Sequence, residues 1–106
     1  MAKYLLEASY SAEGAKGVLK DGGSKRREAA KTLVESLGGK IDCFYFAFGK
    51  SDAVVVADFP DGVSAAAASL AISASGAVSS RITVLLTPEE IDQAAKKSAK
   101  YTPPGR

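Results

Sequence analysis

The chain contains no histidine and no tryptophan, and it has one cysteine among 106 residues. Without an imidazole, several sites are excluded at once: a Ser-His-Asp triad, a Cys-His pair, a haem with a proximal histidine, and a zinc site built on histidines. The glycine-rich segments do not follow a strand into a helix with phosphate-loop spacing, and no metal motif is present. We therefore expect neither a metal ion nor an organic cofactor.

Neither positive nor negative charge predominates. The 14 Lys and Arg residues are nearly balanced by 12 Asp and Glu residues, and the net charge of +2 is spread along the chain. Nucleic acids and anionic membranes attract strongly basic faces, so neither is an expected partner. One basic cluster is interpreted as the solvated face of a helix, and it consists of Lys25, Arg26, Arg27 and Lys31.

Long apolar runs are absent. The small-apolar stretch 63–78 is interrupted by Ser and Gly, and it is shorter than the roughly 20 apolar residues that a membrane span needs. Glu7 breaks the apolar run of Met1–Tyr10, so we expect no secretory leader and a cytoplasmic protein. Cys43 has no second cysteine to pair with and lies in an apolar segment, which predicts a buried, inert thiol.

Periodicity predicts four strands and four helices. Alternating and β-branched segments predict strands at 3–10, 41–48, 53–59 and 78–86, with a turn at 49–52 between the second and third. Helical spacing predicts a short helix after Ser11, a longer one from Ser24 to Leu37, and a third after Asp61. Thr87-Pro88-Glu89-Glu90 is a capping box that predicts a terminal helix to about Lys100.

This order predicts an α+β fold of the ferredoxin-like βαββαβ type, with a four-stranded antiparallel sheet, helices on one face, and an extra C-terminal helix. We expect a single domain over residues 1–101 and a loose tail at 102–106.

The two faces of the expected sheet are both largely apolar. The face expected under the helices carries Tyr4, Leu6, Ala8, Ile41, Cys43, Tyr45, Val54, Val56, Ile82 and Val84. The face expected to be open carries Leu5, Phe44, Phe46, Phe48, Ala53, Val55, Ala57 and Leu85. An antiparallel sheet that faces water should be polar there, so the open face is expected to be covered.

A second copy of the chain is the expected cover. Four strands about 4.8 Å apart and about 20 Å long give a footprint of roughly 400 Å². At about 25 cal/mol per Å² this is on the order of 10 kcal/mol, similar to the roughly 4 to 15 kcal/mol that association costs. We therefore expect a homodimer in which the terminal helix and tail add contacts, and such a dimer could stack into a larger oligomer. The alternative is a monomer whose terminal helix folds back over that face.

Polar residues on the same face form a candidate site. Glu7 and Arg81 lie on the first and last strands, which are neighbours in this fold, so they could pair in a partly desolvated cleft. Beside aromatic side chains, such a pair is typical of a pocket for a small organic ligand, although a structural ion pair is the alternative. The expected ligand-binding residues are Phe44, Phe46, Phe48, Arg81 and Thr83.

Several short segments, in this order and spacing, resemble the GYD-domain family of small bacterial proteins. They are Ser11–Gly14, Arg27–Ala29, Leu37–Lys40, Gly49–Asp52, Phe59–Asp61 and Thr87–Glu90. The resemblance implies a ferredoxin-like domain of the dimeric α/β-barrel type, and the family has no established biochemical function. Of the residues Gly49, Ser51 and Asp52, Ser51 stands where the family has a tyrosine, so a role for that phenol does not transfer.

Two functions are compatible with these residues. The first is non-catalytic: binding of a small hydrophobic or carbonyl ligand in a cleft between the sheet and a partner, or a role as an assembly module. The second is a cofactor-free monooxygenase or isomerase in which a carboxylate transfers a proton while Arg81 orients the substrate. The candidate carboxylates are Glu7 and Asp42.

Overall fold

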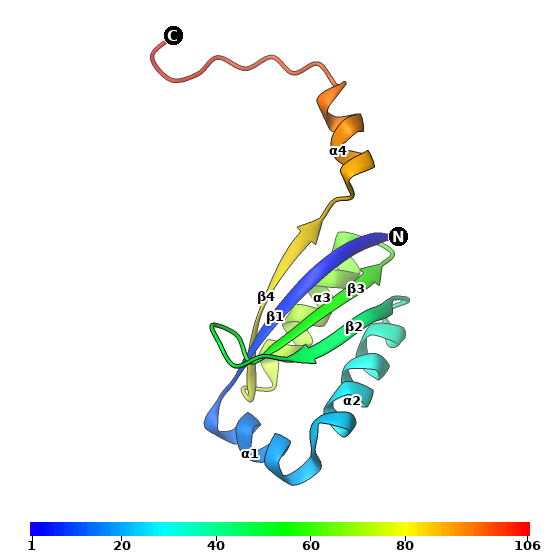
Figure 1. Cartoon of the computed structure of the whole chain (residues 1–106), viewed down its shortest axis with the longest axis vertical. Coiled ribbons are helices and arrows are strands. Elements are labelled where there is room, and N and C mark those ends of the chain that lie inside the picture. The colour runs from blue at the N-terminus through cyan, green and yellow to red at the C-terminus, as the bar shows by residue number, and fades with distance from the viewer.

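The computed structural model describes all residues from Met1 to Arg106. Figure 1 shows its helices and strands. In chain order they are β1 (Ala2–Tyr10), α1 (Ala12–Asp21), α2 (Gly23–Ser36), β2 (Lys40–Phe46), β3 (Ala53–Phe59), α3 (Gly62–Ala74), β4 (Val78–Leu85) and α4 (Pro88–Ala95). The predicted order of elements is confirmed. None of the helices has the length and apolar composition that crossing a bilayer requires.

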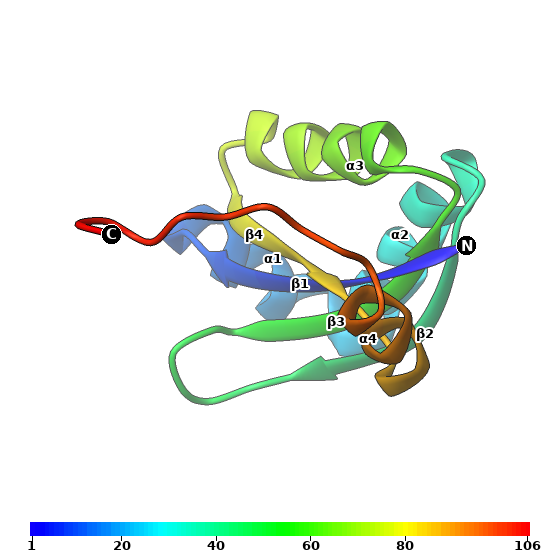
Figure 2. The same cartoon turned by 90° about the horizontal axis from the view of Figure 1, so that it is seen from above.

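The strands form one antiparallel sheet in the order β2-β3-β1-β4. α2 and α3 cover the same face, because Val34 of α2 and Ala65 of α3 share one core with Leu6 of β1. Figure 2 shows α3 lying over β1 and β4. The predicted ferredoxin-like α+β fold is thereby confirmed.

The core lies between this face of the sheet and the two helices. Tyr4 and Leu6 of β1 and Phe59 of β3 are buried in it. The rings of Tyr4 and Phe59 meet edge to face, with their centroids 5.7 Å apart. On α2, Val34 is buried and Leu33 packs beside it, so the apolar stripe predicted for this helix is confirmed.

The predicted sheet faces are correct for β1 and β4 but wrong for most of β2 and β3. Leu6 is the register partner of Val55, and Val55 is the partner of Phe44. Residues directly opposite one another in neighbouring strands share a face, so these side chains all lie on the helix-covered side. The residues moved to that side are Phe44, Phe46, Ala53, Val55 and Ala57, and those moved to the open side are Cys43, Tyr45, Val54 and Val56.

Three helices begin at their predicted caps. The side chains of Ser11, Asp61 and Thr87 each accept a hydrogen bond from a backbone N–H in the first turn of the helix that follows. The bond from the Ser64 N–H to Asp61 is 2.7 Å long, and it holds the pKa of the Asp61 carboxyl below its ordinary value of 3.8. Thr87 and Glu90 complete the capping box.

The cap predicted for α2 is wrong. This helix begins at Gly23, and its cap is Gly22, which has a φ of 84° and offers no side chain. A Cβ atom at Gly23 would lie 2.8 Å from the ring of Phe46. Gly22 therefore supplies the positive φ before the helix, and Gly23 lets α2 start in close contact with Phe46 of β2.

Residues 86–106, the C-terminal arm, stand away from the rest of the chain (Figure 1). α4 ends at Ala95 rather than near Lys100, and it buries none of its residues. The radius of gyration is 16.8 Å, against about 13 Å for a compact domain of this length. Leu86, Ile91 and Tyr101 are exposed. The arm therefore does not fold back over the open face of the sheet.

Candidate functional site

The open face of the sheet is apolar across its middle. A row of register partners crosses the four strands there, and it consists of Cys43, Val56, Leu5 and Thr83. Cys43, Val56 and Leu5 are half-buried in the single chain. Tyr45, beside this row, is 68% exposed. The sequence predicted a buried thiol at Cys43. Within one chain this prediction is wrong, because Cys43 lies on the uncovered face of the sheet.

A polar basin lies at one end of this face, with a volume of about 370 Å³. Glu7 and Arg81 are register partners, as predicted, and Lys50 lines the basin with them. No apolar side chain lines it. The ion pairs of the chain include neither Glu7 nor Arg81. The basin therefore presents one carboxylate and two cations, which suits a ligand with a carbonyl or carboxylate group.

The loop between β2 and β3 brings Ser51 to this basin. Ser51 is only 6% exposed, and its hydroxyl donates a hydrogen bond to Glu7 Oε2 at 3.4 Å. Asp52 ties the loop to β1, since its carboxylate accepts from the Tyr10 N–H at 2.8 Å. Gly49 has no positive φ, so this turn does not use the freedom that glycine offers. In this turn, the contacts with β1 are therefore made by Ser51 and Asp52 and not by Gly49.

Asp42 lies at the opposite end of the open face. Lys3 donates hydrogen bonds to Asp42 and to Asp58, with 3.1 Å between Lys3 Nζ and Asp58 Oδ1. The bond to Asp42, followed by that to Asp58, holds the pKa of the Lys3 ammonium above its ordinary value of 10.5. Lys3 and Glu7 are separated by about 13 Å along β1. The two candidate carboxylates therefore do not share a site.

The predicted aromatic wall is not beside Glu7 and Arg81. Phe44 and Phe46 lie on the helix-covered face, where their ring centroids are 5.3 Å apart. Phe48 is outside the strand and fully exposed. Thr83 does lie on the open face, opposite Leu5. Of the expected ligand-binding residues, only Arg81 and Thr83 thus share the open face of the sheet.

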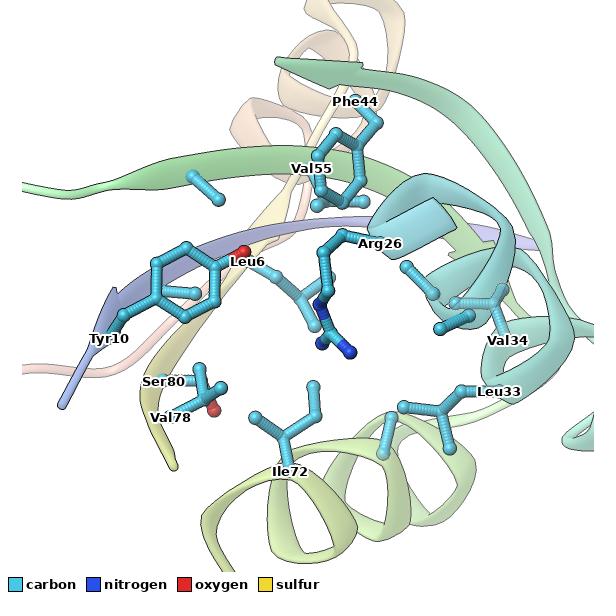
Figure 3. Close-up of a pocket in the computed structure, with 15 residues that line it drawn as sticks. Leu6, Tyr10, Arg26, Leu33, Val34, Phe44, Val55, Ile72, Val78 and Ser80 are labelled. Atoms are coloured by element: carbon cyan, nitrogen blue, oxygen red, sulfur yellow. The ribbon is translucent and has the colours of Figure 1, made fainter. Parts of the chain in front are cut away.

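Arg26 was missed as a candidate residue. It is half-buried rather than solvated, and it lines a cavity between α2, α3 and the sheet (Figure 3). The signal was present in the sequence, because Arg26 precedes Ala30 by four residues and Leu33 by seven. That spacing places all three on the core-facing stripe of the helix.

No cluster of three Cys, Asp or Glu side chains is positioned to hold a metal ion. Among protein families, the model of the GYD domain matches residues 4–95. The matched range includes β1 from Tyr4 onward and the other three strands in full, and it ends at the last residue of α4. No curated protein and no solved structure matches the chain.

Proposed function

The chain belongs to the GYD-domain family, and we propose that its domain is an assembly module that works as a homodimer, with the open sheet faces of two copies packed together. The observation that carries this proposal is the apolar row at the middle of that face, which includes Leu5 and Val56 and has no cover within the chain. An antiparallel sheet whose second face meets water is normally polar there. A second copy offers an apolar face of the same size and shape.

The C-terminal arm supplies the rest of the interface. Two flat footprints of about 400 Å² each sum to about 800 Å², below the roughly 1,200 Å² of the smallest specific interfaces. The arm carries Leu86, Ile91 and Tyr101 exposed on a segment that packs against nothing in its own chain. Laid on the partner, each of these side chains adds about 1.5 to 3 kcal/mol when fully buried.

Packing of the two faces also turns the polar basin into a cleft between sheet and partner. Glu7, Lys50 and Arg81 then lie at the edge of the interface, where water is partly excluded. Lys50 and Arg81 suit the oxygen of a small carbonyl or carboxylate ligand, because charge-assisted hydrogen bonds strengthen as water is removed. Ligand binding in this cleft is the second part of the proposal.

A cofactor-free monooxygenase or isomerase is the alternative function. The long hydrogen bond from Ser51 to Glu7 favours it, because a buried hydroxyl beside the carboxylate helps to orient the group that would accept a proton. Asp42 is not proposed as the base of this reaction, because its carboxylate already accepts a hydrogen bond from Lys3.

Glu7→Gln and Arg81→Ala separate the alternative from the ligand-binding function. If the chain is an enzyme, each variant keeps the thermal midpoint of wild type and loses turnover of a library of quinols and lactones. If it only binds, wild type turns over none of the library. Loss of stability in both variants would assign the pair a structural role.

Sedimentation velocity at micromolar concentration tests the assembly. We expect wild type to sediment as a dimer, and we expect a chain that ends at Leu85 to dimerise at least about 100-fold more weakly, because the exposed apolar side chains of the arm are gone. Far-UV circular dichroism checks that the shortened chain keeps its sheet. A monomeric wild type would contradict the proposal. If the shortened chain dimerised as strongly as wild type, the arm would not be part of the interface.

A further inference from the structure

A second cavity lies on the other side of the sheet from the polar basin. It lies between α2, α3 and all four strands of the sheet, and its volume is about 110 Å³. Of its 15 lining residues, 13 are hydrophobic. The two that are not are Arg26 and Ser80. The hydroxyl of Ser80 is already engaged with that of Ser69 at 3.2 Å, so Arg26 is the charged group in this cavity, and it has no partner in the chain.

The guanidinium of Arg26 points into the middle of the cavity, toward Ile72 and Leu33 (Figure 3). It forms none of the ion pairs of the chain. Glu13 and Asp21 line an adjoining hollow of about 330 Å³, which Arg26 and Tyr10 line as well, and neither carboxylate forms an ion pair with Arg26. Its five N–H donors therefore have no acceptor within the chain, and water still reaches them, because no buried side-chain N or O atom lacks a hydrogen-bond partner.

Tyr10 adds a second free donor. Its ring lines the cavity, and in Figure 3 its hydroxyl also lies on the cavity side. The backbone N–H of Tyr10 is bonded to Asp52, but its hydroxyl forms no hydrogen bond within the chain. A cation and a phenol that converge on an apolar space form a pattern typical of small-molecule sites, where apolar walls are combined with a few directed polar groups.

We propose that this cavity binds a small apolar monocarboxylate, with its carboxylate on Arg26 and Tyr10 and its apolar body against Leu33 and Ile72. A guanidinium matches a carboxylate in a bidentate pair, which fixes the charged end of the ligand. The volume limits the other end. An apolar cavity of about 150 Å³ accepts benzene, so this space of about 110 Å³ holds the apolar end of one ring or a short branched chain, while the carboxylate lies toward the adjoining hollow that Arg26 and Tyr10 also line.

A purely structural role explains this arginine poorly. Water still reaches the guanidinium nitrogens, but placing a charge against apolar walls removes part of its hydration, and Met or Leu at the same helical position would fill the space without that cost. Arg27, the next residue, is exposed and does not line this cavity. An arginine that served only to solvate the helix surface could therefore stand there, without a second one in the cavity.

Benzoate and its neutral isostere benzamide are the probes, and binding to full-length wild type is followed by isothermal titration and by the thermal midpoint. We expect benzoate to raise the midpoint through preferential binding to the folded state. Benzamide should bind at least about tenfold more weakly, because it cannot form the charge-assisted pair. Arg26→Met should weaken benzoate binding by a similar factor, whereas Arg27→Met should not change it.

Ala30→Leu is a second test that keeps Arg26 in place. Ala30 lines the cavity, so a larger side chain there occupies the ligand's space and should abolish benzoate binding without lowering the thermal midpoint of the free protein. No benzoate binding by wild type would overturn the proposal. Equal affinity for benzamide, or for benzoate in Arg26→Met or Ala30→Leu, would overturn it as well. The cavity needs no residue from a partner, so these outcomes do not depend on dimer formation.

Discussion

Val56→Glu should convert the proposed dimer to a monomer. Val56 lies at the centre of the open face, between Leu5 on β1 and Cys43 on β2. In a single chain the new carboxylate is reached by water, but between two packed sheets it is buried without a partner, at a cost of about 3 to 5 kcal/mol. The dissociation constant measured by sedimentation should therefore rise by at least about 100-fold.

Val63→Glu is the matched control for this substitution. Val63 is 80% exposed in the first turn of α3, where a carboxylate is favourable to the helix dipole. It lies on the helix side of the sheet, away from the proposed interface. We expect a dimer as strong as that of wild type. If Val63→Glu dissociated the dimer and Val56→Glu did not, the interface would lie on α3 and not on the sheet.

Local chemistry predicted most of the fold. The bounds of β3 agree with the prediction, and Ser11, Asp61 and Thr87 cap the helices that follow them. These features depend on neighbours within a few residues, and such signals are legible in a single sequence. The end of α4 was overestimated, because Lys96 and the residues after it carry good helix propensity but have nothing to pack against.

The assignment of faces failed where alternation was ambiguous. β3 is apolar at both sets of alternate positions, and only Asp58 distinguishes them, since it shares a face with Val54 and Val56. That aspartate was the available signal. In β2 a bulge between Ile41 and Cys43 shifts the alternation by one residue, so Phe44 joins Ile41 on the covered face. A bulge depends on pairing with the neighbouring strand, and the pattern of one strand does not reveal it.

The candidate site was predictable only where topology decided it. Glu7 and Arg81 meet because the first and last strands of this fold are adjacent. The approach of Ser51 to Glu7 and the binding of Asp42 by Lys3 depend on loop path and register, which no local pattern encodes. Gly14 shows the same limit. A Cβ atom there would lie 2.2 Å from the Ala77 carbonyl oxygen, so a glycine of the matching segment Ser11–Gly14 is needed for a contact between distant parts of the chain.

Phe59→Ala should cost about 3 to 5 kcal/mol of the free energy of unfolding, which is a large share of the total for a domain of this size. Phe59 is fully buried, and it is the largest side chain of which this is true. Its removal deletes the edge-to-face contact with Tyr4 and opens a cavity between the sheet and the helices. Thermal denaturation followed by circular dichroism should show a midpoint at least about 12 °C lower than that of wild type.

Phe48→Ala makes the same chemical change at a fully exposed position in the loop between β2 and β3. It removes no packed contact, so the free energy of unfolding should stay within about 0.5 kcal/mol of wild type. The sequence alone presents both residues as phenylalanines near a strand end. The structure separates them, because β2 ends at Phe46, before Phe48, whereas Phe59 is paired with Ala2 within the sheet. Equal losses in the two variants would contradict that register, because Phe59 would then not be the buried ring that the pairing of Ala2 with Phe59 places at the edge of the core.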